Sequence, residues 1–166
     1  MEIKDNFLPK DIFKKLQTIM YSDDMEWHYR DAQVKPTDEE YFVHCFFNNS
    51  LPLSRHFYLM DDIVTSLKAA ALIQIRANLT LKKPKQLESG WHTDYTNENY
   101  CKTAILYMNN NNGYTKLKHN NKIKKISCKE NRILIFDGNI EHCAGLTTDT
   151  KTRMVININY YGADKN

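Results

Sequence analysis

Helical spacing of apolar residues marks two stretches in the first part of the chain. Residues 10–21 carry apolar side chains three and four positions apart, and Pro9 stands just before them, where a first helical turn tolerates proline. A similar spacing recurs between residues 57 and 69. The pattern therefore predicts a helix over residues 10–21 and a second helix over residues 57–69.

Extended segments are predicted between and around these helices. Residues 27–31 mix polar and aromatic side chains, and residues 41–47 are rich in aromatic and β-branched ones. We expect both segments to be extended, the second as a strand. Residues 34–40 contain Pro36 among polar neighbours, which is typical of a surface loop.

The pattern changes after residue 70. Short apolar or alternating runs follow one another, each ended by Asn, Gly or charged residues. The clearest runs cover residues 72–81, 103–108, 113–117, 122–127, 132–137 and 153–161. Short strands separated by turns favour a sandwich or barrel over alternating β/α units. We therefore predict one mainly-β domain with N-terminal helices over residues 1–166, with helical support and outer strands in residues 1–70 and an all-β half in residues 71–166.

Composition excludes several classes of function. The net charge of +3 is too small to favour nucleic-acid binding, for which a strongly basic face is expected. No run of about 18 apolar residues is present, so we expect no membrane span. Residues 1–10 carry charges at short intervals, which is unlike a signal peptide. Nothing in the sequence indicates an oligomeric state.

The four cysteines, at positions 45, 101, 128 and 143, show neither the spacing of a zinc site nor that of a dense disulfide framework. They are expected to be buried reduced thiols of a cytoplasmic protein. Lys, Asn, Ile and Tyr, which have AT-rich codons, are abundant, and this bias favours a phage or a small-genome bacterium as the source. For a phage-encoded protein the location would be the cytoplasm of the host cell.

The first candidate for chemistry is a histidine and an aspartate two residues apart, His92 and Asp94. In an extended segment both side chains point to the same side of the backbone, so both can bind one metal ion. Pairs of this kind also arise by chance, and most of them are surface residues. His92 and Asp94 therefore need a third ligand before a metal site is predicted.

His142 can supply that third ligand. It follows the apolar run 132–137 and a turn at Gly138 and Asn139, where a jelly roll would return the chain to the same metal ion. Two histidines and one carboxylate occupy one face of an ion and leave three positions open, as in non-haem Fe(II) oxygenases. Zinc-dependent hydrolysis with the same three ligands remains an alternative.

A polar-faced strand favours iron over zinc. Alternation along residues 153–160 puts Arg153, Val155, Asn157 and Asn159 on one face and Met154, Ile156, Ile158 and Tyr160 on the other. The second face is apolar and predicts core, whereas the first is expected to line a wet cavity. The planar guanidinium of Arg153 suits a carboxylate such as the distal one of 2-oxoglutarate. The alternative is an arginine in a surface ion pair.

Taken together, these pieces resemble a known family. They are residues 89–94, 103–109, 131–137, His142 and residues 153–161. Over residues 71–166 the chain resembles the Fe(II)/2-oxoglutarate-dependent dioxygenases, and within them the prolyl-hydroxylase-like branch, including small phage-encoded members. The resemblance implies a double-stranded β-helix (jelly roll, cupin-like) core. It also implies Fe(II), 2-oxoglutarate and O2 as cofactor and co-substrates, with ascorbate as an optional addition.

The resemblance assigns roles to individual residues. His92, Asp94 and His142 would be the metal ligands, and Arg153 and Tyr107 would hold the distal carboxylate of 2-oxoglutarate. Asn78 and Asn157 would also face 2-oxoglutarate. Apart from the resemblance, we expect Arg76, Lys102, Trp91 and Asn159 at the substrate rim, although Trp91 can equally be an ordinary aromatic residue of the sheet.

This sequence departs from its relatives at several positions. Many of them carry Lys in place of Arg153, and the prolyl hydroxylases of hypoxia signalling have Trp in place of Asn159. Val155, Asn157 and Asn159 break the R-x-N-x-T-x-R pattern of the DNA-repair demethylases.

The resemblance implies a hydroxylase of prolyl residues in a peptide or protein, with release of succinate and CO2. Hydroxylation of a small molecule, a sugar or a nucleotide is one alternative, and a non-catalytic jelly-roll binding module is another. Residues 82–90, with Lys82, Lys83, Lys85 and Gln86, are expected to be either a substrate lid or a solvated loop. His28, His44, His56 and His119 lack a second ligand at metal spacing, so we expect structural or surface roles for them.

Overall fold

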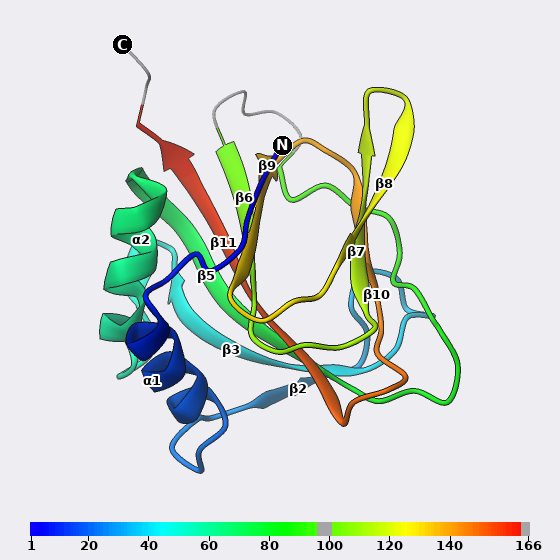
Figure 1. Ribbon diagram of the computed structural model, residues 1–166, viewed down its shortest axis with the longest axis horizontal. Coiled ribbons are helices and arrows are strands. Elements are labelled where there is room, and N and C mark those ends of the chain that lie inside the picture. Colours follow the sequence, from blue (N-terminus) through cyan, green and yellow to red (C-terminus); the bar gives the residue numbers. More distant parts are fainter. Residues whose placement is uncertain (96–100, 164–166) are drawn as a thin grey trace.

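A large antiparallel sheet, a small sheet facing it and two helices make up the computed structural model, which describes residues 1–95 and 101–163 (Figure 1). The helices are α1 (Lys10–Met20) and α2 (Asp61–Leu67), with a 3-10 turn, η1 (Phe57–Met60), before α2. The large sheet has the order β1-β9-β6-β11-β5-β3-β2, with β4 paired to β3, and the small sheet has the order β10-β7-β8. The strands of the large sheet are β1 (Glu2–Lys4), β2 (His28–Arg30), β3 (Tyr41–Asn48), β4 (Leu51–Pro52), β5 (Ala69–Leu81), β6 (Cys101–Tyr107), β9 (Arg132–Asp137) and β11 (Thr152–Gly162). Those of the small sheet are β7 (Tyr114–His119), β8 (Lys122–Ser127) and β10 (His142–Gly145).

From β5 onward the chain passes back and forth between the two sheets. After β5 it runs along β10, where the bridges Glu88↔Gly145 and His92↔His142 add residues 88–92 to the small sheet. It then returns to the large sheet in β6, forms β7 and β8 in the small one, and continues through β9, β10 and β11 in alternation. This path is a double-stranded β-helix, so the predicted jelly-roll fold is confirmed.

Two cores separate the layers. The first lies between the helices and the outer face of the large sheet and contains Phe13 and Leu16 of α1 together with the apolar face of β11. The second lies between the two sheets and contains Ile105 of β6, Leu117 of β7 and Phe136 of β9. Figure 1 shows the helices on one side of the large sheet and β7, β8 and β10 on the other. The helices therefore support the sheet from behind and leave its inner face to the site.

The predicted second helix is shorter than expected. Residues 57–60 form a 3-10 turn, and α2 ends at Leu67 because Lys68 adopts a left-handed conformation with φ 52°. Strand β5 begins directly after it, at Ala69. The sequence pattern also missed β1 and β4, which are three and two residues long.

Two expectations from composition can be compared with the structure. None of the four cysteines forms a disulfide, and three of them are buried. No helix within residues 1–95 or 101–163 is long and apolar enough to cross a membrane.

The left-handed Lys68 gives a prediction about stability. A side chain in this conformation costs about 1 kcal/mol, and glycine avoids that cost at the end of a helix. We expect Lys68→Gly to raise the free energy of unfolding by roughly 0.5 to 1 kcal/mol, measured by urea denaturation. Lys68→Ala, which keeps a Cβ, is the matched control and should give no gain. Equal stability of the two variants would contradict the argument.

Candidate metal centre and its pocket

Three side chains meet where residues 88–92 run beside β10. His92 is the last residue of this segment, and Asp94 follows it by two residues. His142 is the first residue of β10. One ligand atom from each lies within 4.8 Å of the others, and Asp94 Oδ1 is 3.8 Å from the Nε2 atom of both histidines. No other group of three such residues forms in the described parts of the chain. The geometry fits one ion held on one face.

Backbone contacts orient both imidazole rings. His92 and His142 exchange two backbone hydrogen bonds of 3.0 and 2.8 Å, so their side chains project from the same face of the small sheet. Nδ1 of His92 lies 3.3 Å from the Gly90 carbonyl, and Nδ1 of His142 lies 3.1 Å from the Ile140 carbonyl. With the proton on Nδ1 donated to a carbonyl, each Nε2 keeps its lone pair for a metal. Burial also lowers the pKa of His142, which favours the neutral form that a metal binds.

Two side chains fix the Asp94 carboxylate. Its Oδ2 accepts a hydrogen bond of 2.6 Å from the Thr103 hydroxyl and one of 2.8 Å from the Asn159 amide. Asn159 also donates to the Thr103 oxygen over 3.0 Å, and both residues are buried. The structure therefore places Asn159, predicted at the substrate rim, behind the metal ligand. Oδ2 of Asp94 thus accepts two hydrogen bonds, whereas Oδ1 faces the histidines.

Arg153 reaches the same pocket from β11 and is only 3% exposed. One terminal nitrogen donates weakly to the Tyr114 carbonyl at 3.3 Å and to the Thr115 hydroxyl at 3.4 Å, while its Nε is buried without a partner. A Cβ on Gly113 would lie 2.8 Å from the Arg153 side chain, so glycine is needed there for the arginine to pass. Arg153 is thus a buried cation without a carboxylate partner, which excludes the surface ion pair considered as an alternative.

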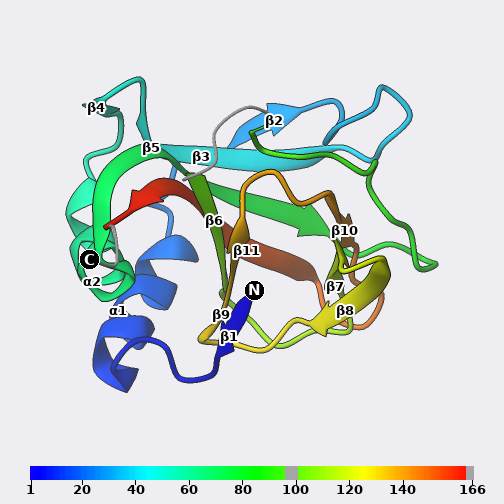
Figure 2. The same cartoon turned by 90° about the horizontal axis from the view of Figure 1, so that it is seen from above.

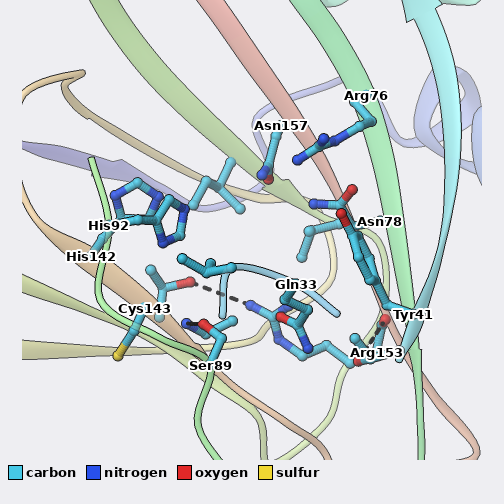
Figure 3. Close-up of a pocket in the computed structure, with 16 residues that line it drawn as sticks. Gln33, Tyr41, Arg76, Asn78, Ser89, His92, His142, Cys143, Arg153 and Asn157 are labelled. Atoms are coloured by element: carbon cyan, nitrogen blue, oxygen red, sulfur yellow. Dashed lines mark hydrogen bonds between the residues drawn. The ribbon is translucent and has the colours of Figure 1, made fainter. Parts of the chain in front are cut away.

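Unpartnered polar atoms gather around the pocket. Buried side-chain atoms without a hydrogen-bond partner occur on Gln33, Arg76, Asn78, Arg153 and Asn157, all of which line it (Figure 3). Such atoms are rare in folded proteins, because each one loses its hydrogen bonds to water. Among the lining residues that the structure describes there is no Asp or Glu. Three of the unpartnered atoms are donor nitrogens, on Gln33, Arg76 and Arg153, and two are acceptor oxygens. With two arginines and no described acidic residue, the pocket suits an anionic ligand such as 2-oxoglutarate, next to a metal ion.

Three of the predicted site residues lie elsewhere. Tyr107 is fully buried behind Thr115, to which its hydroxyl donates at 2.8 Å, and burial raises its pKa. Lys102 precedes the inward-facing Thr103, points to the other side of β6 and pairs with Asp137. Trp91 lies on the outer side of the small sheet, where the Lys118 ammonium is 4.8 Å from its ring centre. We therefore correct the prediction that Lys102 and Trp91 border the substrate and that Tyr107 contacts 2-oxoglutarate directly.

The loop of residues 82–90 is held in place by hydrogen bonds and ion pairs. Lys83 pairs with Glu39 at 2.6 Å and with Glu40 at 2.8 Å, and Asp38 accepts a hydrogen bond of 2.9 Å from the Gly90 amide. Figure 2 shows this loop beside residues 31–40. These contacts anchor the loop at Lys83 and at Gly90. Within residues 82–90 only Ser89 lines the pocket, and Lys82, Lys85 and Gln86 are exposed.

Sequence reasoning missed several residues of the site. Thr103, Thr115 and Gln33 were not singled out, because a lone threonine in a strand and a glutamine in a polar loop carry no motif.

The expectation that His44 is structural fits its surroundings: its ring lies 2.7 Å from both the Glu26 carbonyl and the Ser54 hydroxyl.

The contact between Asn159 and Asp94 gives a testable prediction. Asn159→Ala removes one of two hydrogen bonds that hold the carboxylate, so we expect metal affinity to fall by roughly 10- to 100-fold. Titration with Co(II), followed by its visible absorption, measures this. Asn157→Ala is the matched control, since Asn157 lies on the same face of β11 but does not contact Asp94. Similar affinities for wild type and Asn159→Ala would show that Thr103 alone orients the ligand.

Comparisons with known proteins bear on the fold. No family profile matches the chain, and no curated protein matches it in sequence. A prolyl-4-hydroxylase from Pseudomonas putida aligns over 98% of this chain and 92% of its own, with 14% identity and a TM-score of 0.62. A prolyl hydroxylase from Trichoplax adhaerens, solved with a hypoxia-inducible-factor peptide fragment, aligns over 96% and 82%, with 16% identity and a TM-score of 0.65.

A third structure comes from antibiotic biosynthesis. The non-haem α-ketoglutarate-dependent epimerase SnoN, from nogalamycin biosynthesis, aligns over 97% of this chain and 78% of its own, with 10% identity and a TM-score of 0.66. The chain therefore shares its double-stranded β-helix fold with these three structures.

Proposed function

We propose that this protein is an Fe(II)- and 2-oxoglutarate-dependent oxygenase. The observation that carries the proposal is one pocket that has candidate metal ligands at one end and a guanidinium at the other. His92 and His142 lie at one end, with Asp94 beside them, and the buried Arg153, which has no carboxylate partner, lies at the other. Figure 3 shows the two histidines and Arg153 at these positions. A keto acid with a second carboxylate fits such a pocket, since one end can bind the metal and the other the guanidinium.

His92 and His142 would hold the ion through their Nε2 atoms, and Asp94 would hold it through its carboxylate. When bound, Fe(II) with 2-oxoglutarate and O2 supplies the oxidising chemistry, which releases succinate and CO2 and oxidises a C–H bond of the substrate. The part of this chain is to hold the ion, bind the keto acid and position that C–H bond.

Arg153 and Thr115 bind the distal carboxylate in this proposal. The Thr115 oxygen accepts hydrogen bonds from the Tyr107 hydroxyl and from Arg153, so its own hydrogen points to a further acceptor. A carboxylate beside Arg153 provides that acceptor. Tyr107 thus acts as a positioning residue. Asn78 and Asn157 contribute amide groups to the wall of the pocket.

For the substrate we propose a prolyl residue of a peptide or protein. Support comes from the two prolyl hydroxylases with this fold, one of which was solved with a peptide fragment. A small-molecule substrate is the second candidate, because SnoN, from nogalamycin biosynthesis, has a comparable TM-score. Incubation with proline-containing peptides and with cell lysate, followed by a search for the mass gain of one oxygen atom, separates the two.

Loss of a metal ligand should abolish activity. In His92→Ala only two ligands remain, so we expect no substrate-coupled succinate formation and loss of stable metal binding. The readouts are succinate by chromatography and bound iron by elemental analysis. His119→Ala, which removes a histidine from the end of β7, is the control. Full activity of His92→Ala would rule out the assignment.

Loss of Arg153 should act on 2-oxoglutarate. A charge-assisted hydrogen bond contributes about 1.5 to 3 kcal/mol, so Arg153→Ala should raise the 2-oxoglutarate requirement by roughly 10- to 100-fold. Arg153→Lys should have a smaller effect, because it keeps the charge and loses only the planar fork. Anaerobic titration of the Fe(II) protein with 2-oxoglutarate, followed by visible absorption, measures the requirement directly. The exposed Arg30→Ala is the control, and an unchanged requirement in Arg153→Ala would mean that another residue binds the distal carboxylate.

A further inference from the structure

A second arginine enters the pocket, at a distance from Arg153. Arg76 lies on β5 and is partly buried, and Figure 3 shows its side chain directed into the pocket near Asn78 and Asn157. Its Nε is buried and has no hydrogen-bond partner. Within residues 1–95 and 101–163 no ion pair reaches its guanidinium either. Arg76 is therefore a cation that the fold holds in place without compensating its charge.

Among the residues that the structure describes, the surroundings of Arg76 offer polar groups but no negative charge. Asn157 is its cross-strand neighbour on β11 and Cys45 is its neighbour on β3, while Asn78 lies two residues further along β5. The side-chain oxygens of Asn78 and Asn157 are also buried without partners. One unpartnered guanidinium nitrogen, which donates, and two unpartnered amide oxygens, which accept, thus face one region of the pocket. Leaving them unpaired is costly, which points to a ligand that satisfies them.

The proposed co-substrate does not account for Arg76. In the register of β5 and β11, Arg76 pairs with Asn157 and Arg153 pairs with Thr80, so the two arginines are four residues apart along the strands. At about 3.3 Å per residue this is a separation of roughly 13 Å along the sheet. 2-Oxoglutarate has two carboxylates, and the metal end and Arg153 use both of them. The charge of Arg76 remains for another molecule in the pocket.

We propose that Arg76 binds a carboxylate of the substrate that is oxidised, while the unpartnered oxygens of Asn78 and Asn157, which only accept hydrogen bonds, face donor groups of the same molecule. A guanidinium offers a planar fork that matches a carboxylate, and no acidic residue of the described parts of the chain lines the pocket to occupy that fork. The proposal rests on the proposed function, because it takes the Arg153 end to be filled by 2-oxoglutarate. It makes Arg76 a residue that determines specificity: the substrate carries an acidic group close to the C–H bond that reacts.

The carboxylate can be the terminal one of a small molecule or a side chain of a peptide, and three probes separate these sources. N-acetyl-L-proline has a terminal carboxylate, N-acetyl-L-prolinamide has none, and N-acetyl-prolyl-glutamyl-amide has only a side-chain carboxylate. Calorimetric titration of the anaerobic Fe(II) protein, saturated with 2-oxoglutarate, gives the affinity of each. We expect one carboxylate probe to bind at least about 10-fold more tightly than the amide probe.

Variants of Arg76 test the assignment itself. Arg76→Gln should remove the preference for the carboxylate probe, and Arg76→Lys should retain part of it. Arg30→Gln, on the exposed strand β2, is the matched control and should keep the full preference. Thermal denaturation of each variant verifies that the fold is intact. If no carboxylate probe binds better than the amide, or if Arg76→Gln keeps the preference, the proposal is wrong.

Anaerobic binding of 2-oxoglutarate, measured on the same samples by visible absorption, separates the two proposals. Wild-type protein that binds 2-oxoglutarate but shows no carboxylate preference disproves only the role of Arg76. Wild-type protein that does not bind 2-oxoglutarate disproves the proposed function. Weaker 2-oxoglutarate binding in Arg76→Gln would assign Arg76 to the co-substrate and would also overturn the inference.

Discussion

The two backbone hydrogen bonds between His92 and His142 are the contact on which the candidate site depends. They join residues 88–92 to β10 and so bring together two parts of the chain that are far apart in sequence. Because these two residues face each other in the pair, both rings project into the space between the sheets. Asp94 follows His92 by two residues, so no further strand or helix is needed to bring its carboxylate to the two histidines.

The large sheet supplies the remaining residues of the candidate site. The inner face of β11 presents Asn159 to Asp94 at one end and Arg153 to the pocket at the other, while its outer face packs against the helices. A shift of β11 by one residue would exchange these faces and bury the arginine in the apolar core. The helical layer therefore serves the site indirectly, since the apolar face that it covers fixes the register of the polar face.

Alternation in the sequence predicted part of the site and could have predicted more. It predicted that His92 and Asp94 point to the same side of the backbone, and it separated the polar face of β11 from the apolar one. The structure shows both arrangements. The same alternation, applied to Trp91, puts that residue on the outer side, where it lies. The expectation that Trp91 borders the substrate did not apply this alternation, which separates Trp91 from its neighbour His92.

Other features could not be read from the sequence, because they depend on how strands pair. Thr103 reaches Asp94 and Thr115 stands between Tyr107 and Arg153 only in the register that the folded sheets adopt. The end of α2 was missed for a different reason. Lys68 takes a backbone conformation that favours glycine, so no residue type signalled the end of the helix.

The carboxylate of Asp38 links two walls of the pocket. It accepts hydrogen bonds from the backbone of Val34 and Lys35 on one side and from Gly90 on the other, two residues before the first metal ligand. A ligand that orders residues 31–40 therefore also orders the segment that holds the metal. By thermodynamic linkage the effect is reciprocal. If the metal changes the affinity for such a ligand by some factor, the ligand changes the affinity for the metal by the same factor.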